Sequence, residues 1–170
     1  MLSEYLAEVR KALHEVEQQE EQLRHIAKTI GDCQLVHIMG NGGSASTAQH
    51  FAQGLCDLGI PALCFSDNSS LLTAISNDQS YEDVFSKQSD IFCLTEDDVT
   101  VVISASGNSE NILRPLGNIA RDSVGLLGFG GGKAADLVGS AIILSSQDYG
   151  VVEDVHLVIC HLICRLIKNG

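Results

Sequence analysis

The chain has 170 residues, 45% of them hydrophobic, and a formal net charge of −12. This size suits one domain with one core, and the acidic balance argues against nucleic acid and anionic membranes as partners, because both attract basic patches. The six cysteines lie in apolar runs without a CxxC motif, so we interpret them as reduced core residues. Without a signal peptide or a long apolar run, the chain is expected to be cytoplasmic.

Residues 2–30 carry apolar side chains at three- and four-residue spacing, which predicts a helical arm. Gly31 fits the C′ position that ends such a segment. An arm of this length exceeds what one small sheet needs for cover, so we predict that it packs on another subunit. We therefore divide the chain into an oligomerisation arm, residues 1–33, and a domain of residues 34–170.

After the arm, strand patterns alternate with helix patterns. The predicted strands are residues 35–39, 62–65, 99–103, 124–128 and 141–144. The predicted helices are residues 44–57, 69–76, 81–88, 109–120 and 151–167, with a short helix after residues 130–132. This alternation implies an α/β fold in which a parallel five-stranded sheet lies between two helical layers. Ligands of such sheets bind at the carboxyl ends of strands near the topological switch point.

Two loops rich in glycine and serine follow two of these strands. The first loop, residues 40–45, reads GNGGSA, and the second loop, residues 104–109, reads SASGNS. Glycines let backbone N–H groups approach an anion, a helix N-terminus adds partial positive charge, and serine hydroxyls donate hydrogen bonds. Helix capping would use one or two hydroxyls of the second loop, which has three. We therefore predict a site for a phosphorylated small molecule.

The first loop also nearly matches the dinucleotide fingerprint G-x-G-x-x-A. That fingerprint requires an acidic residue about 20 positions further on, at the end of the next strand. The candidate here, Asp67, lies 27 positions after Gly40. The second loop has no role in dinucleotide binding. The pattern therefore favours a phosphosugar, and no nucleotide cofactor is expected.

Histidines and a carboxylate recur near the helices that flank this predicted site. His50 lies in the helix after the first loop, and Glu153, His156 and His161 lie in the last helix. At 100° per residue, Glu153 and His161 differ by about 80° and lie two turns apart. They can border one cavity, but they cannot both bind one metal ion without help from the fold. Core packing and an acid–base or metal site remain alternatives for these side chains.

Taken together, these segments resemble the SIS (sugar isomerase) domain, and within it the phosphoheptose isomerases. The resemblance covers nearly the whole chain: the arm, the first loop with His50-Phe51-Ala52, Ser66-Asp67, Asn77-Asp78, the second loop, residues 128–133 and the last helix. It implies a single SIS domain in a homotetramer with active sites between subunits. The implied reaction interconverts sedoheptulose 7-phosphate and a manno-heptose 7-phosphate through an enediol, which needs a base, an acid and an anchored phosphate.

The resemblance also implies roles for individual residues. The phosphate-binding residues are Gly42, Gly43, Ser44, Ser104, Ala105, Ser106 and Ser109. The residues that line the sugar are Asn41 and Asp78. His50 and His161 match zinc-site positions of the family, and His161 also matches the histidine assigned to proton transfer.

Two positions depart from the family pattern. Four residues after His50, where the family has a catalytic, metal-binding glutamate, this chain has Gly54. In the last helix, where the family has a glutamine, this chain has Glu153. One hypothesis makes Glu153 the base or a metal ligand, so that His50, Glu153 and His161 form a three-ligand zinc site with an open position. The alternatives are an isomerase of another phosphosugar and a non-catalytic regulatory module, like the relative that assists the bacterial replication initiator.

Overall fold

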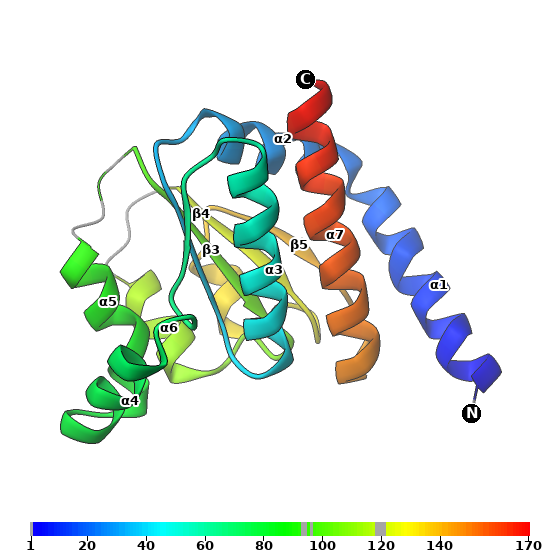
Figure 1. The fold of residues 1–170 in the computed structure, drawn as a ribbon. Helices are drawn as coiled ribbons and strands as arrows, with labels where there is room; N and C mark the ends of the chain where they lie inside the picture. Colours follow the sequence, from blue (N-terminus) through cyan, green and yellow to red (C-terminus); the bar gives the residue numbers. More distant parts are fainter. Residues whose placement is uncertain (1, 93–94, 96, 118–121) are drawn as a thin grey trace.

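The structure, a computed structural model, describes residues 2–92, 95, 97–117 and 122–170 (Figure 1). Five parallel strands form one sheet in the order β2-β1-β3-β4-β5. They are β1 (Val36–Gly40), β2 (Ala62–Cys64), β3 (Val99–Ser104), β4 (Ser123–Leu127) and β5 (Ser140–Ile143). Each predicted strand is confirmed, with its ends within one residue of the prediction. The strand order reverses between β1 and β3, which is therefore the switch point of the sheet.

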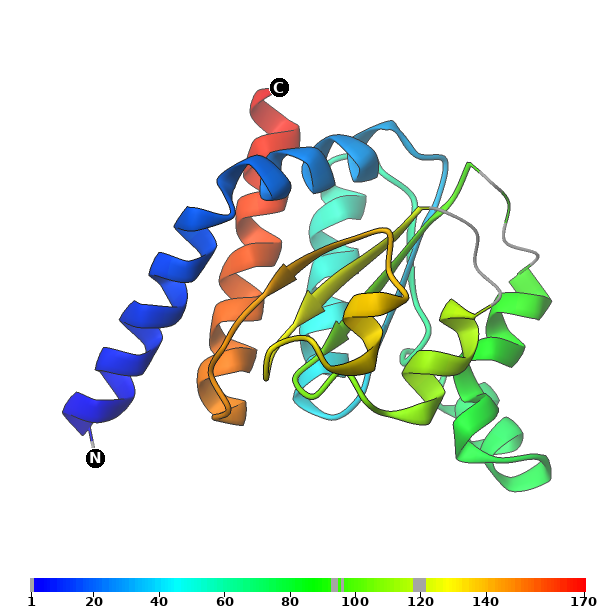
Figure 2. The ribbon, with the colours of Figure 1, turned by 180° about the vertical axis from the view of Figure 1, so that it is seen from behind.

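Helices cover both faces of the sheet, so the three-layer α/β fold is confirmed (Figures 1 and 2). One face carries α1 (Leu2–Gln18), α2 (Glu20–Asp32), α3 (Gly43–Asp57) and α7 (Tyr149–Asn169). The other carries α4 (Ser69–Asp78), the 3-10 helix η1 (Tyr81–Asp83), α5 (Val84–Phe92), α6 (Glu110–Leu116) and the 3-10 helix η2 (Gly132–Asp136). Successive strand residues alternate between the two cores: Val101 and Ile103 face the first, and Val102 faces the second.

The arm ends differently from the prediction. It consists of two helices that meet at Gln19, and Gly31 lies inside α2. Residue 33, in extended backbone at φ −82° and ψ 165°, follows the last turn in place of a left-handed glycine. The prediction that Gly31 occupies the C′ position is therefore wrong, because this helix ends without the left-handed motif.

Most of the arm packs on its own chain. Its second helix buries Leu23, Ile26, Ala27 and Ile30 in the first core. The hydroxyl of Tyr5 donates to Asp154 Oδ2 of α7 at 2.6 Å. The start of α1, by contrast, leaves Leu2 76% and Leu6 43% exposed. Length alone thus does not require a second subunit, and both the subunit contact and the boundary after residue 33 stay predictions.

The cysteines are less uniformly buried than predicted. Cys64 and Cys160 are buried, Cys33 and Cys164 are half-buried, and Cys56 is exposed, so the core prediction is wrong for Cys56. These five are free thiols. The sixth, at position 93, lies outside the described residues, as do residues 118–120 of the predicted helix 109–120. Within the described segments, we find no helix with the length and hydropathy needed to cross a bilayer.

The stability of the folded protein depends on pH through His156 of α7. The side chain is fully buried, and neither ring nitrogen has a hydrogen-bond partner in the described part of the chain. Burial lowers its pKa from 6.5 to about 4, so the folded protein holds it neutral while the unfolded chain binds a proton below pH 6.5. The free energy of unfolding therefore falls by about 3 kcal/mol as the pH drops through this range.

We expect the variant His156→Leu, which has a similar volume and no titratable group, to lose less stability on acidification than the wild type. Urea unfolding on either side of that pH range measures the difference. Part of the pH dependence should remain, because burial also lowers the pKa of His37. An equal acid-side loss in the variant and the wild type would contradict this account.

Candidate functional site

The first and second loops meet at the switch point of the sheet. Gly40 at the end of β1 is in register with Ile103 of β3, so the loops that follow these strands are neighbours. Together with the start of α7 they border a cavity of about 110 Å³, which we call the serine pocket. The serine pocket is lined by Asn41, Ser44, Ile103, Ser104, Ala105, Ser106, Ser109, Tyr149 and Glu153. Seven of these nine residues were predicted from the sequence as site residues.

The four serines of this pocket divide into two pairs. The hydroxyl oxygen of Ser104 accepts the N–H of Gly107 at 3.0 Å, and that of Ser106 accepts the N–H of Asn108 at 3.3 Å. These two therefore shape the second loop. Ser109 stands at the N-cap of α6 without a side-chain capping bond, and Ser44 forms no side-chain hydrogen bond with the described residues. Capping thus leaves these two hydroxyls free to bind a ligand.

Two glycines of the loops make contacts that are too close for a Cβ atom. A Cβ atom on Gly43 would overlap the carboxylate of Glu153, so the start of α3 touches α7 at this point. A Cβ atom on Gly107, whose φ is +61°, would overlap the carbonyl oxygen of Gly131. The loop of residues 128–133, which follows β4, therefore packs on the second loop. Glycine is therefore required at position 107, where the contact is with backbone and φ is positive, whereas a Cβ atom at position 43 would displace the end of the Glu153 side chain.

Glu153 is the only charged residue among those that line the serine pocket. It is half-buried, and its carboxylate lies against Gly43 at the N-terminal, partially positive end of α3. Among the residues that the structure describes, no lysine or arginine lines the pocket. An anion bound there must therefore be held by backbone N–H groups and serine hydroxyls, with the carboxylate as its neighbour.

His50 and His161 form a separate pair outside the serine pocket. The helices α3 and α7 run side by side in the same direction (Figures 1 and 2), and each contributes one histidine. The two Nε2 atoms are 2.9 Å apart, and both side chains are exposed. Glu153 lies eight residues before His161, which corresponds to about 12 Å along the helix axis. The structure thus brings the histidines together but leaves Glu153 apart from them.

This arrangement bears on the predicted zinc site. In the described part of the chain, no three His, Cys, Asp or Glu side chains are grouped so that they could hold a metal ion. The predicted set of His50, Glu153 and His161 is therefore not assembled within one chain. The position of the family glutamate, Gly54, faces Cys164, whose Sγ atom would lie 3.3 Å from a Cβ atom on the glycine. The residues present supply two imidazole nitrogens and no third ligand.

Of the two residues predicted to line the sugar, one lines the serine pocket and the other does not. Asn41 lines the serine pocket and exchanges two side-chain hydrogen bonds of 2.9 Å with Asn111. Asp78 is exposed at the end of α4, where its carboxylate accepts a hydrogen bond from Asn77. Tyr81 of η1 reaches the site in its place, donating its hydroxyl to Asn41 Oδ1 at 2.9 Å. Sequence reasoning missed Tyr81 and Asn111.

Tyr149 is a further pocket residue that sequence reasoning missed. The last helix was predicted to begin at residue 151, but it begins at Tyr149, after the N-cap Asp148. The carboxylate of Asp148 accepts the N–H of Val151 at 3.1 Å, as an N-cap residue does. An aspartate three residues before the predicted start was the sequence feature that marks this helix start.

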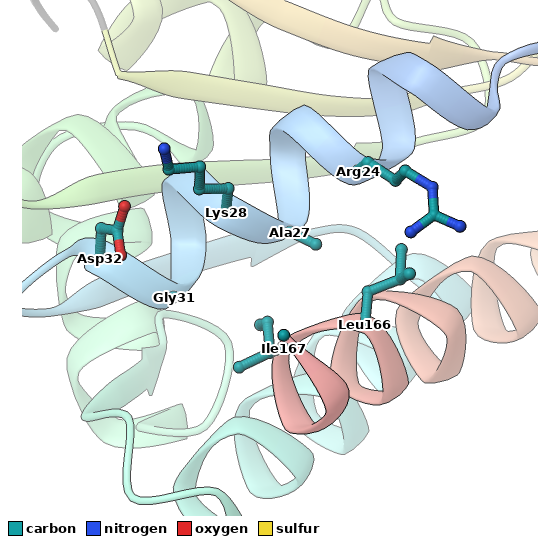
Figure 3. A pocket seen from close by; sticks show the side chains of 8 residues that line it. Arg24, Ala27, Lys28, Gly31, Asp32, Leu166 and Ile167 are labelled. Atoms are coloured by element: carbon teal, nitrogen blue, oxygen red, sulfur yellow. The ribbon is translucent and has the colours of Figure 1, made fainter.

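A larger groove of about 450 Å³ lies at the other end of α7, between this helix and α2 (Figure 3). Leu166 and Ile167 form its apolar side, and Arg24, Lys28 and Asp32 form its polar side. Arg24 is already bonded to Glu20. The described residues that line this groove come from α2, α7 and the residue that follows α7, so they do not include the glycine and serine loops of the serine pocket.

Comparison with known proteins agrees with this geometry. The model of the SIS domain family matches residues 4–121. A phosphoheptose isomerase of Aliarcobacter butzleri is 33% identical over 99% of this chain and 96% of its own, and one of Trichlorobacter lovleyi is 38% identical over 78% and 72%. The solved structure of phosphoheptose isomerase from Neisseria gonorrhoeae superposes with a TM-score of 0.92 at 29% identity, covering 99% of this chain and 97% of that one. The chain therefore belongs to the SIS domain family, among relatives that are phosphoheptose isomerases.

Proposed function

We propose that this protein is a phosphoheptose isomerase that interconverts sedoheptulose 7-phosphate and an aldoheptose 7-phosphate. The observation that carries the proposal is the serine pocket, in which two hydroxyl-rich loops and one carboxylate converge at the switch point. Relatives that align along nearly the whole chain are phosphoheptose isomerases. The pocket supplies the two parts that the chemistry needs, an anchor for a phosphate and a group that accepts a proton.

The phosphate is held without a cation. The free hydroxyls of Ser44 and Ser109 and the backbone N–H groups at the start of α3 donate to its oxygens. Hydrogen bonds to a charged acceptor are about twice as strong as those between neutral groups, so a few donors suffice in a partly buried pocket. Anchoring the phosphate on C7 fixes one end of the sugar, and the carbon chain must fold back for C1 and C2 to reach the carboxylate of Glu153 in the same pocket.

Proton transfer between C1 and C2 is assigned to Glu153 and His161. Glu153 is the carboxylate of the serine pocket, at the position where the family pattern has glutamine. We assign to it the role of the family glutamate, whose position is Gly54 in this chain. His161 of the same chain lies about 12 Å further along α7, too far to reach the same carbon atom. We therefore propose that His161 comes from a second copy, in a homotetramer whose sites lie between subunits.

The described residues of this chain do not form a complete zinc site. Of the zinc ligands that the family resemblance implies, the structure brings together only His50 and His161. The described residues add no third donor. When bound, zinc would polarise the oxygens of the substrate. Assays with added zinc and with a chelator separate this contribution from that of the protein residues.

Replacing Ser44 by alanine should weaken binding of inorganic phosphate by about tenfold, because one donor to a charged group is lost. Isothermal titration measures the effect. The matched control is Ser46→Ala, two residues along the same helix, where the side chain is exposed and outside the pocket. Equal losses in both variants would contradict the assignment of Ser44 to the phosphate.

Replacing Glu153 by glutamine should lower kcat for sedoheptulose 7-phosphate at least a hundredfold, since a general base contributes about that much or more. Binding of the sugar phosphate should persist. The matched control, Asp154→Asn, changes the neighbouring carboxylate, which lies outside the pocket and accepts a hydrogen bond from Tyr5. Unchanged turnover in Glu153→Gln would disprove the role of Glu153, and a wild type that binds but does not turn over would indicate a binding module.

Mixing two inactive variants tests whether the site is shared. Chains with Glu153→Gln and chains with His161→Asn are unfolded together and refolded in equal amounts. If each site takes Glu153 from one copy and His161 from another, about a quarter of the sites combine two intact residues and activity returns. If both residues act within one chain, the mixture stays as inactive as its components.

A further inference from the structure

Tyr149 and Phe129 form an aromatic pair at the edge of the serine pocket. Tyr149 lines the pocket and is 59% exposed, an unusual exposure for a large ring beside a polar cavity. The ring of Phe129 meets it edge to face, with the ring centroids 4.8 Å apart and the planes at 67°. Aromatic pairs prefer this geometry, so Phe129 restricts the orientations of the exposed ring.

Phe129 also has an unusual backbone conformation. Its φ is +53°, and it is the only described residue other than glycine with a positive φ. A bulky residue there is uncommon, and such strain persists where the surroundings enforce it, often at ligand sites. Here the N–H of Phe129 donates to the carbonyl oxygen of Ser146 at 3.1 Å. The hydroxyl of Ser146 in turn accepts the N–H of Asp148, the residue before Tyr149.

Ser146 thus joins the backbone of Phe129 to the start of α7, so the two residues that carry these rings lie on connected backbone segments. The ring of Tyr149 is also the only aromatic surface among the residues that line the serine pocket. The serines and the helix N-terminus bind the phosphate, so the aromatic face is left for the uncharged part of the ligand. The C–H groups of a sugar carbon chain are the apolar surface that such a ring packs against.

We propose that Tyr149 is a specificity-determining residue that packs against the carbon chain of the bound sugar phosphate, and that Phe129 is its positioning residue. This inference rests on the proposed function, because it takes a sugar phosphate as the ligand. It makes affinity for the sugar phosphate depend on the ring, whereas affinity for inorganic phosphate depends on the serines alone.

Isothermal titration with inorganic phosphate and with sedoheptulose 7-phosphate tests the proposal in the full-length protein. In Tyr149→Ala, the affinity for the sugar phosphate should fall roughly three- to tenfold, while the affinity for inorganic phosphate stays as in the wild type. Tyr149→Phe, which keeps the ring, should match the wild type for both ligands. Phe129→Ala should lower the affinity for the sugar phosphate alone and raise KM without changing kcat.

The outcomes separate this inference from the proposed function. If the wild type binds the sugar phosphate and Tyr149→Ala binds it equally well, the aromatic subsite is disproved while the function stands. If the wild type binds no sugar phosphate, both fail. If adenosine monophosphate binds more tightly than the sugar phosphate and loses that affinity in Tyr149→Ala, the ring stacks on a base and the assignment to a sugar is overturned.

Discussion

The second loop and the loop of residues 128–133 pack backbone against backbone at the carboxyl edge of the sheet, with no space for a Cβ atom on Gly107, and the shape of the site depends on this contact. Gly43 lets the start of α3 touch Glu153 of α7, and Gly107 lets the second loop touch the backbone at Gly131. A side chain at Gly107 would push these two loops apart, and one at Gly43 would displace the carboxylate of Glu153 from the start of α3. The shape of the second loop and the position of the carboxylate therefore depend on these two glycines.

Much of this site was predictable from sequence, because topology fixes where strand ends lie. Once the chain was interpreted as alternating strands and helices, the loops at residues 40–45 and 104–109 were placed on one edge, and the spacing of Glu153 and His161 already kept them apart. The arrangement of helices was not predictable in this way. The contact between His50 and His161 requires α3 and α7 to run side by side, which is a tertiary property.

Charge shapes the way in which this protein binds an anion. With a net charge of −12 and no lysine or arginine among the described residues that line the serine pocket, long-range attraction does not favour a phosphate. Short-range donors on rigid loops must supply the affinity. Gly54, where the family pattern has a glutamate, is not among the residues that line the serine pocket and faces Cys164.

The most direct test of this account is a crystal structure of the protein with inorganic phosphate. The account predicts one phosphate in the serine pocket, bonded to Ser44, Ser109 and the backbone at the start of α3. Phosphate bound instead in the groove beside Arg24 and Lys28, with the serine pocket occupied by water alone, would contradict it, because local cations would then outweigh the donors of the loops.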